Sequence, residues 1–446
     1  HPAYHPRINI KLLMLAHVDS MRSSRRIAKN ANENVVYIYL AEKTQPDFRT
    51  ISEFRRKNKK LISNVFKELN TFALKEGLLD LSHLMIDGTK IKADANNNRV
   101  IEKETLDKLS KYIDRVIEEG ISIDEEEDKL YGDRGLHQLP EELNDSEKRR
   151  PIIRQIVNNI NKSMKEGNKE NVQQIKSDLQ NLKQKMEGQG IKRYSFTDLE
   201  SRFMQSYKKH TDLCYNAQII VDKNGLIVSN DVVNETADRS QSIPMINKVE
   251  QNFGQLPKGT KFIGDAGYEN GEALEELEQR GLDLFVAGKN MINKPKKKFA
   301  KANFAYDEEN DRYICPKGKM LNFVSITTTH NRYDYMKNYR CKNCSTCPYQ
   351  KECCKNYKSR SIGATPFDKL LNRIKVKLKT PEGRATYNLR KQTVERSFGD
   401  MKYHKKFTNF LLRGKEKAKI EWNLSCIAHN LVMINNLMKK RNLAGC

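Results

Sequence analysis

Two short segments of the sequence, each mostly apolar, end in an aspartate, and this shared pattern constrains the fold more than any other feature. Residues 81–86 run into Asp87, and residues 261–264 run into Asp265. A short apolar run that stops at a polar turn is typical of a buried β-strand. An acid at the exit of such a strand is presented at the edge of the sheet. We therefore predict that Asp87 and Asp265 lie at the ends of two core strands.

Further strand and helix patterns follow between these two aspartates and after the second one. Residues 215–221 and 225–233 have strand patterns, and the turn between them contains Gly225, which can adopt a positive φ in a hairpin. Helical patterns over 242–253 and 270–281 surround the second aspartate, and a last short strand follows at 282–287. Three antiparallel strands followed by alternating helix and strand is the order of an RNase H-like α/β core. We assign residues 79–99 and 194–292 to this core.

Two regions of helical pattern lie outside this core. Residues 1–78 predict an N-terminal helical domain with many basic residues, which is either a DNA-binding headpiece or a helical layer of the scaffold. Residues 100–193 are highly charged, and apolar residues recur every three or four positions between Asn171 and Gln189. This pattern predicts a helical hairpin or coiled-coil-like insertion, whose charges form solvated helix faces.

Six of the nine cysteines lie between Cys315 and Cys354. This crowding marks residues 293–362 as a small Cys-rich insertion. Four thiolates suffice for a structural, tetrahedral zinc site, and reduced thiols packed in a small module are the alternative. The preferred ligands are Cys315, Cys344, Cys347 and Cys353, with Cys341 as the alternate and Cys354 as a spare.

The C-terminal part of the core, residues 363–446, carries the third acid. Offsets of four, four, three and four residues predict one helix with one polar face, which carries Tyr387, Lys391, Glu395, Phe398 and Lys402. A carboxylate between cations is also typical of a salt-bridged helix surface. Together with Asp87 and Asp265, however, Glu395 completes the set of oxygen ligands that two Mg²⁺ or Mn²⁺ ions about 4 Å apart require. We predict that these three acids are the catalytic metal ligands.

The charge of the chain favours a polyanionic partner. Lys and Arg number 81 against 57 Asp and Glu, which gives a formal net charge of +24. Nucleic acid is the leading candidate, because neutralising phosphates releases condensed counterions. The alternative is an AT-rich genome, whose codons inflate the lysine content. The sequence has no apolar stretch near the ~20 residues of a membrane span and no secretory signal, so we expect a cytoplasmic protein without a membrane partner.

At several places the residues match a known family. The blocks Asp87–Ala93, Gly264–Tyr268 and Val394–Lys402 resemble the three catalytic blocks of bacterial insertion-sequence DDE transposases. The N-terminal residues Tyr4–Pro6, Ser23–Arg26 and Pro46–Ile51 are similar to the helical domain that precedes the core in this family. Residues Asp198, Arg202, Met204 and Tyr215–Gln218 resemble its linker into the second strand. The resemblance covers nearly the whole chain and points to the group with a cysteine-containing insertion.

The resemblance implies an RNase H-like fold, catalysis with Mg²⁺ or Mn²⁺, and action on double-stranded DNA at transposon ends and target sites. It also implies at least a dimer in the synaptic complex and a bacterial, nucleoid-associated location. Tyr387, Arg390, Glu395 and Lys402 resemble the Tyr-Arg-Glu-Lys signature of related transposases, which implies contacts with DNA. Arg390 is one residue further from Glu395 than in that signature, and Lys391 occupies the expected place.

The expected chemistry has two steps, with Asp87 bridging both metal ions, Asp265 on one and Glu395 on the other. Hydrolysis frees a 3′-hydroxyl at the element's end, and this hydroxyl then attacks a target phosphodiester. Rival acids are Asp94, Asp198 and Asp212, together with Asp238, the most plausible supporting group. Two alternatives remain open: a DNA-binding protein derived from a transposase, and a metal-dependent nuclease without strand transfer.

Overall fold

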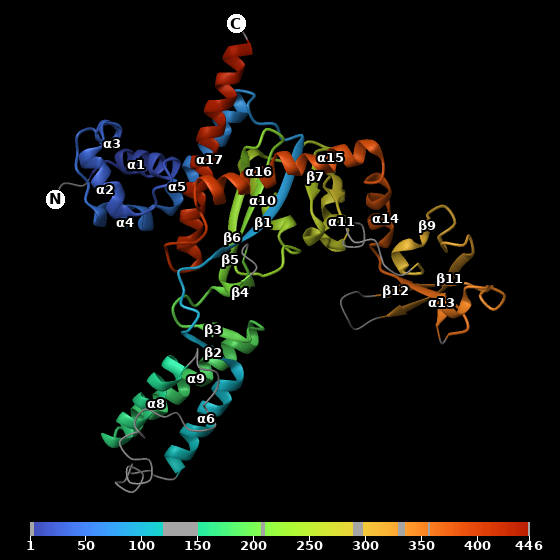
Figure 1. The fold of residues 1–446 in the computed structure, drawn as a ribbon, viewed down its shortest axis with the longest axis horizontal. Helices are drawn as coiled ribbons and strands as arrows, with labels where there is room; N and C mark the ends of the chain where they lie inside the picture. Colours follow the sequence, from blue (N-terminus) through green and yellow to red (C-terminus); the bar gives the residue numbers. More distant parts are fainter. Residues whose placement is uncertain are drawn as a thin grey trace.

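A mixed β-sheet forms the centre of the molecule (Figure 1). The computed structural model describes residues 4–118, 150–206, 210–288, 298–328, 335–355 and 357–444. The sheet is built from β1 (His83–Lys92), β4 (Arg202–Gln205), β5 (Thr211–Val221), β6 (Ile227–Val233), β7 (Lys261–Gly264) and β8 (Asp283–Val286). Its order is β4-β5-β1-β7-β8, and β6 also pairs with β5. Strands β1, β5 and β6 pair antiparallel, whereas β1, β7 and β8 pair parallel. The predicted strands and the mixed α/β class are thus present.

The hairpin between β5 and β6 shows how local sequence sets the sheet. Gly225 has a φ of 87°, as expected of glycine in this turn. The carboxylate of Asp222 accepts hydrogen bonds from the backbone N–H groups of Asn224 and Leu226 at 2.9 and 2.8 Å. Residues 213–222 are all buried, so β5 is a central strand, and it begins earlier than the predicted residue 215.

Helices cover the sheet and carry the C-terminal part of the core. They are α10 (Ser242–Phe253), α11 (Gly271–Gln279), α14 (Asp368–Lys377), α15 (Pro381–Gln392), α16 (Val394–Gly399) and α17 (Lys415–Ala444). A short 3₁₀ turn, η4 (Ala266–Tyr268), follows β7, and a π-helical turn, η6 (Asp400–His404), follows α16. The long helix α17 packs against β6, and α16 packs against β1 and β5.

The N-terminal helices share one apolar core with the sheet. They are α1 (Pro6–Val18), α2 (Ser24–Glu33), α3 (Val35–Leu40), α4 (Phe48–Lys57) and α5 (Lys59–Lys75). Helices α1 and α5 pack against α17, and a single cluster of buried residues runs from Ile8 through the sheet to Ile434. Arg22 also reaches the buried carboxylate of Glu421 on α17 at 2.9 Å. These helices are therefore anchored to the core, whether or not they also bind DNA.

The helical insertion has an apolar core of its own. It contains α6 (Lys103–Glu118), α8 (Arg150–Lys165) and α9 (Lys169–Gly188), and residues 119–149 of the predicted insertion lie outside the described residues. Strands β2 (Val100–Glu102) and β3 (Arg193–Ser195) pair at its base, which the sequence did not predict. Helix α9 packs against both α6 and α8, and its Val172, Leu179 and Met186 are buried. The insertion projects away from the central sheet (Figure 1).

The cysteine-bearing region is a small β-rich module, whereas the sequence predicted only its cysteines. It contains β9 (Ala305–Asp307), β10 (Arg312–Ile314), β11 (Met320–Thr328), β12 (Tyr335–Arg340), β13 (Ser361–Ala364), the 3₁₀ turn η5 (Lys301–Asn303) and the short helix α13 (Gln350–Cys354). The five strands form a separate sheet in the order β13-β12-β11-β10-β9. A third apolar cluster, which includes Tyr313 and Tyr339, fills this module.

Candidate active site

Strand pairing explains why the two predicted aspartates are neighbours. Met85 of β1 pairs with Ile263 of β7 in parallel register. Two residues further along each strand direction, Asp87 and Asp265 stand at the same level. Strand β7 ends at Gly264, whereas β1 continues to Lys92, so Asp87 lies within its strand and not at the predicted exit. The parallel register therefore brings together two acids that are far apart in the sequence.

Asp87 is held by its own backbone and by an arginine. Its Oδ1 accepts a hydrogen bond from Gly88 N at 2.8 Å, and its Oδ2 lies 3.3 Å from a guanidinium nitrogen of Arg390. Burial raises the pKa of Asp87 to about 6; Arg390 lowers it, while Asp265 and Asp238 raise it further. The carboxylates of Asp265 and Asp238 are therefore close enough to disfavour the charged form of Asp87, whereas Arg390 favours it.

Asp265 is fixed by the turn that follows β7. Its Oδ1 accepts a hydrogen bond from Gly267 N at 2.7 Å, so this carboxylate caps η4. A Cβ atom added to Gly267 would approach Asp265 Oδ1 to 2.9 Å, so a larger residue here would displace this carboxylate. The Gly264–Tyr268 block thus gives this acid a defined position.

Asp238 was predicted only as a group that supports the three metal-binding acids. It accepts hydrogen bonds from Lys90 Nζ at 2.9 Å and from Asn216 Nδ2 and Gln218 Nε2 at 2.7 Å each. The hydroxyl of Tyr268 in turn donates to Gln218 Oε1. Two polar residues, Asn216 and Gln218, within an otherwise apolar buried strand were the available sequence signal. These hydrogen bonds form a network of polar side chains beside Asp87.

The other rival acids have partners elsewhere. Asp94 pairs with Arg413 at 2.8 Å, and Asp212 lies 3.6 Å from Lys92 Nζ. Asp198 is buried and accepts a hydrogen bond from the hydroxyl of Tyr215 at 2.6 Å. None of these contacts involves Asp87 or Asp265.

Glu395 lies on α16, which packs against β1, but its side chain is exposed. Within the described part of the chain, no hydrogen bond or ion pair involves its carboxylate. Over the same residues, no three Asp, Glu, His or Cys side chains are gathered closely enough to hold a metal ion. Glu395 therefore lies on a helix that packs against β1, but among the described residues its carboxylate makes no hydrogen bond or ion pair with Asp87.

The prediction of a single C-terminal helix was wrong. Helix α15 ends at Gln392, Thr393 has φ −116° and ψ −93°, and α16 begins at Val394. The hydroxyl of Thr393 donates to Leu389 O at 2.8 Å, a back-bond of the kind that bends helices. The π-helical turn η6 then follows, and such turns are frequent at functional sites. These two irregularities rotate the residues of the predicted face relative to one another.

Of the four predicted DNA-contacting residues, three lie near the acids or near one another, and Lys391 lies apart from them. Arg390 is buried against Asp87 and lies 3.4 Å from the hydroxyl of the half-buried Tyr387. Lys391 is exposed. Lys402, on η6, has a pKa lowered by burial, an effect that the negative charge of Asp87 opposes. Arg390 and Lys402 thus face the acids, and Lys391 faces solvent.

Trp422 of α17 packs in the core and joins the two parts of the site. Its side chain is fully buried, and its indole N–H donates to Gln218 O at 3.2 Å. Its ring stacks on Phe398 of α16 with the ring centroids 6.3 Å apart. This tryptophan therefore fixes α16 relative to the sheet.

The six clustered cysteines line one small cavity of the Cys-rich module. They are Cys315, Cys341, Cys344, Cys347, Cys353 and Cys354. The backbone N–H groups of Lys317 and Lys319 donate to Cys315 Sγ at 3.3 Å each, and Arg360 N donates to Cys344 Sγ at 3.4 Å. Burial raises the pKa of the Cys341 thiol to about 11 and that of Cys354 to about 12, and both thiols contact Cys344. The preferred quartet and the two remaining cysteines thus line the same cavity, although in the described residues no three of them are close enough to hold a metal ion.

Comparison with known protein families identifies two parts of the chain. Residues 314–434 match a family described as a transposase DDE domain, and residues 1–57 match a family described as a transposase domain (DUF772). These two matches support an insertion-sequence DDE transposase. No curated protein and no solved structure matches it.

The two family matches bear on activity, metal use and DNA binding. The match to a transposase DDE domain supports a transposase role; such transposases bind DNA at transposon ends and generally use divalent metal ions. Glu395 lies within the matched residues 314–434, whereas Asp87 and Asp265 lie outside both matches. In the residues described, no helix is long and apolar enough to cross a membrane.

Proposed function

We propose that this transposase cuts DNA at transposon ends and joins the freed ends to a target. The observation that carries the proposal is the parallel pairing of Met85 with Ile263, each two residues before one of the acids, together with the rise in the pKa of Asp87 that the charge of Asp265 causes. The strand order β4-β5-β1-β7-β8, in which β6 also pairs with β5 and the parallel strands β7 and β8 follow β1, supports an RNase H-like core. Three separate apolar clusters support the division into a core with N-terminal helices, a helical insertion and a Cys-rich module.

The acids fit divalent metal ions by their chemistry. Asp87 and Asp265 offer hard oxygen ligands, and the charges of Asp265 and Asp238 raise the pKa of Asp87, a repulsion that a divalent cation relieves. We propose that Asp87, Asp265 and Glu395 hold Mg²⁺ or Mn²⁺. When bound, such ions activate the attacking oxygen and stabilise charge on the leaving oxygen.

The neighbouring cations have a different role. Arg390 has a buried Nε that finds no hydrogen-bond partner in the described residues. Because a guanidinium binds phosphate oxygens in a fork, we propose that Arg390 and Lys402 orient the scissile phosphate, with Tyr387 supporting Arg390. Lys391 would contact DNA further from the acids, since it is exposed.

The same residues serve both chemical steps. Hydrolysis at the element's end and attack of its 3′-hydroxyl on the target both displace an oxygen at phosphorus in line. Synapsis of two ends requires two copies of this site, so we propose at least a dimer on DNA. A nuclease without strand transfer would use an identical site and would stop after hydrolysis.

Cleavage and joining of labelled DNA with the element's ends test the proposal, in Mg²⁺ or Mn²⁺, with the unmodified protein and Glu395→Gln. We expect metal-dependent cutting and joined product, both lost in the variant while DNA binding persists. Cutting without joining would favour the nuclease. Binding with neither reaction would indicate a DNA-binding protein derived from a transposase.

We also propose a structural zinc ion in the Cys-rich module. Six cysteines around one cavity, with N–H groups aimed at Cys315 and Cys344, support a thiolate site of four ligands. Metal analysis of the purified protein should find one zinc per chain, reduced in Cys344→Ser and retained in Cys214→Ala. A protein without zinc that keeps its fold and activity would mean that the thiols only pack.

A further inference from the structure

An open groove lies between the base of the helical insertion and the central core. It has a volume of about 1230 Å³. One wall runs from the end of α9 to β3, and the opposite wall contains Arg413, Gly414 and Lys415. Residues 197–200, 202–203 and 234–236 complete the lining. We call this the basic groove, because six of its lining side chains are cationic: Lys185, Lys192, Arg193, Arg202, Arg413 and Lys415.

The positive charge of the basic groove is only partly neutralised. Its lining contains three acids, Asp198, Glu200 and Glu235. Asp198 is 2% exposed and accepts a hydrogen bond from Gly414 N, and Glu200 accepts one from Lys415 N. By contrast, no ion pair within the described ranges involves the ammonium groups of Lys185, Lys192 or Lys415. The groove therefore offers cations to an external anion.

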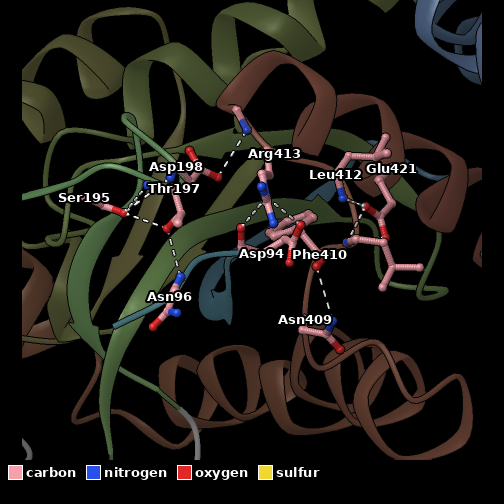
Figure 2. Close-up of polar contacts among 12 residues, drawn as sticks. Asp94, Asn96, Ser195, Thr197, Asp198, Asn409, Phe410, Leu412, Arg413 and Glu421 are labelled. Carbon is pink, nitrogen blue, oxygen red and sulfur yellow. Dashed lines mark hydrogen bonds and ion pairs between the residues drawn. The ribbon is translucent and has the colours of Figure 1, made fainter. Parts of the chain in front are cut away.

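Hydrogen bonds and ion pairs hold the residues beside the groove in place, and Figure 2 shows several of these contacts. The segment 409–415 follows η6. It contacts the chain both where it enters the helical insertion and where it leaves the insertion. Arg413 pairs with Asp94 at 2.8 Å, before the insertion, and Gly414 N donates to Asp198 at 3.1 Å, after it. Leu411 N and Leu412 N donate to the buried Glu421 at 3.0 and 3.2 Å.

The segment that enters the insertion and the segment that leaves it are also hydrogen-bonded to each other. Asn96 N donates to Thr197 Oγ1 at 2.8 Å, and Thr197 lies 3.1 Å from the hydroxyl of Ser195. The groove walls are therefore held in place without a ligand, so that a ligand does not have to order them.

The basic groove continues towards the acids. Its lining residues Asn234–Thr236 lead directly into Asp238, whose carboxylate contacts Lys90 and Gln218 beside Asp87. Asn216 Nδ2 bonds both Glu235 O at 3.2 Å and Asp238 Oδ1 at 2.7 Å, which joins the groove to the site. From residue 234 to residue 238 the chain spans at most about 14 Å, which corresponds to roughly four base pairs of a duplex.

We propose that the basic groove binds one phosphodiester backbone of the DNA duplex, a few base pairs from the bond that is cut. The inference rests on the proposed function and adds a second DNA contact to it. The insertion would then serve as one wall of the DNA path. Phosphate is the anion that fits, because the groove offers several separate ammonium and guanidinium groups and few hydrogen-bond acceptors that read bases. An acidic protein segment is the competing partner.

The test compares two variants that lose the same charge. The groove variant is Lys185→Gln, Lys192→Gln and Lys415→Gln, and the control is Lys351→Gln, Lys439→Gln and Lys440→Gln, three lysines exposed elsewhere. Binding of a labelled 40-base-pair duplex is measured at several salt concentrations without divalent metal. Each lost phosphate contact lowers the slope of log affinity against log salt by about 0.9. We expect a loss of up to about 2.7 in the groove variant and little change in the control.

The outcomes separate this inference from the proposed function. Equal slopes in both variants, or a preference of the groove for an acidic peptide over DNA in competition, would overturn the inference. If the groove variant keeps its salt dependence of DNA binding while Glu395→Gln abolishes cleavage, the groove does not bind DNA but the proposed transposase reaction is supported. If the groove variant loses part of its salt dependence but neither the unmodified protein nor any variant cuts DNA, the groove binds DNA and the proposed reaction is wrong.

Discussion

The candidate site has two halves: the strand half, with Asp87 and Asp265, and the helix half, with Glu395 on α16. They differ in how far the fold positions them before any metal ion or DNA binds. Asp87 lies within β1 and Asp265 directly follows the adjacent parallel strand β7; both accept backbone hydrogen bonds and lie near Arg390. Glu395 lies on an exposed face of α16, between a helix break at Thr393 and a π-helical turn. Strand pairing fixes positions through many hydrogen bonds, whereas a short helix between two irregularities is fixed mainly by packing. The comparison predicts unequal contributions of the two halves to metal binding.

The largest expected effect is on metal affinity in the absence of DNA. Asp87→Asn should weaken Mn²⁺ binding at least about 100-fold, because it removes a ligand of the prearranged pair. Glu395→Gln should weaken it less than about 10-fold, although both variants lose cleavage. Titration calorimetry measures both, with Asp178→Asn on α9 as the control. Equal losses in the two variants would show that the helix half is prearranged as well.

The second prediction concerns Arg390 and Lys391. Arg390→Gln should destabilise the metal-free protein by roughly 1–3 kcal/mol, since it leaves the carboxylate of Asp87 beside Asp265 without its cation. Lys391→Gln should change stability by less than about 0.5 kcal/mol, because its side chain is exposed. Chemical denaturation measures the difference. A similar cost for both variants would contradict the assignment of Arg390 to the strand half.

The third prediction uses the raised pKa of Asp87. Protons compete with metal ions for this carboxylate, whose pKa is about 6, so Mn²⁺ affinity should fall up to tenfold per pH unit below that value. Above it the carboxylate is ionised and the dependence should flatten. In Arg390→Gln the midpoint should move to higher pH, because the guanidinium lowers this pKa. An unchanged midpoint in that variant would mean that Arg390 does not act on Asp87.

The smallest effect is expected at the contact that joins the halves. Trp422→Phe removes the indole hydrogen bond to Gln218 O and part of the stacking on Phe398, and should cost about 1–2 kcal/mol of stability. Tyr403→Phe, at a side chain that is 75% exposed, is the matched aromatic control. If cleavage falls more in Trp422→Phe than its stability explains, the tryptophan also positions α16. Unchanged stability would show that other contacts hold α16.

The core strands were predictable because their patterns are local. The apolar runs before Asp87 and Asp265, and the Gly225 turn, each report on one element. The Asp238 network was harder to predict, because Lys90, Asn216 and Gln218 meet only through the pairing of β1 with β5. The break at Thr393 was missed because helical periodicity continues across it, and a single threonine back-bond gives little signal in the sequence. The β-rich structure of the Cys-rich module was missed because its cysteines dominated the pattern.

The sequence by itself determined the family resemblance, the class of the core strands, the helical insertion and the clustering of the cysteines. These features depend on residue order and on apolar spacing, which are local properties. Only the tertiary structure decided that Asp87 faces Arg390 and Asp265, that Lys391 faces solvent, and that the insertion forms one wall of a basic groove. The physical reason is that register and packing join residues hundreds of positions apart, and periodicity within one segment contains no information about such contacts.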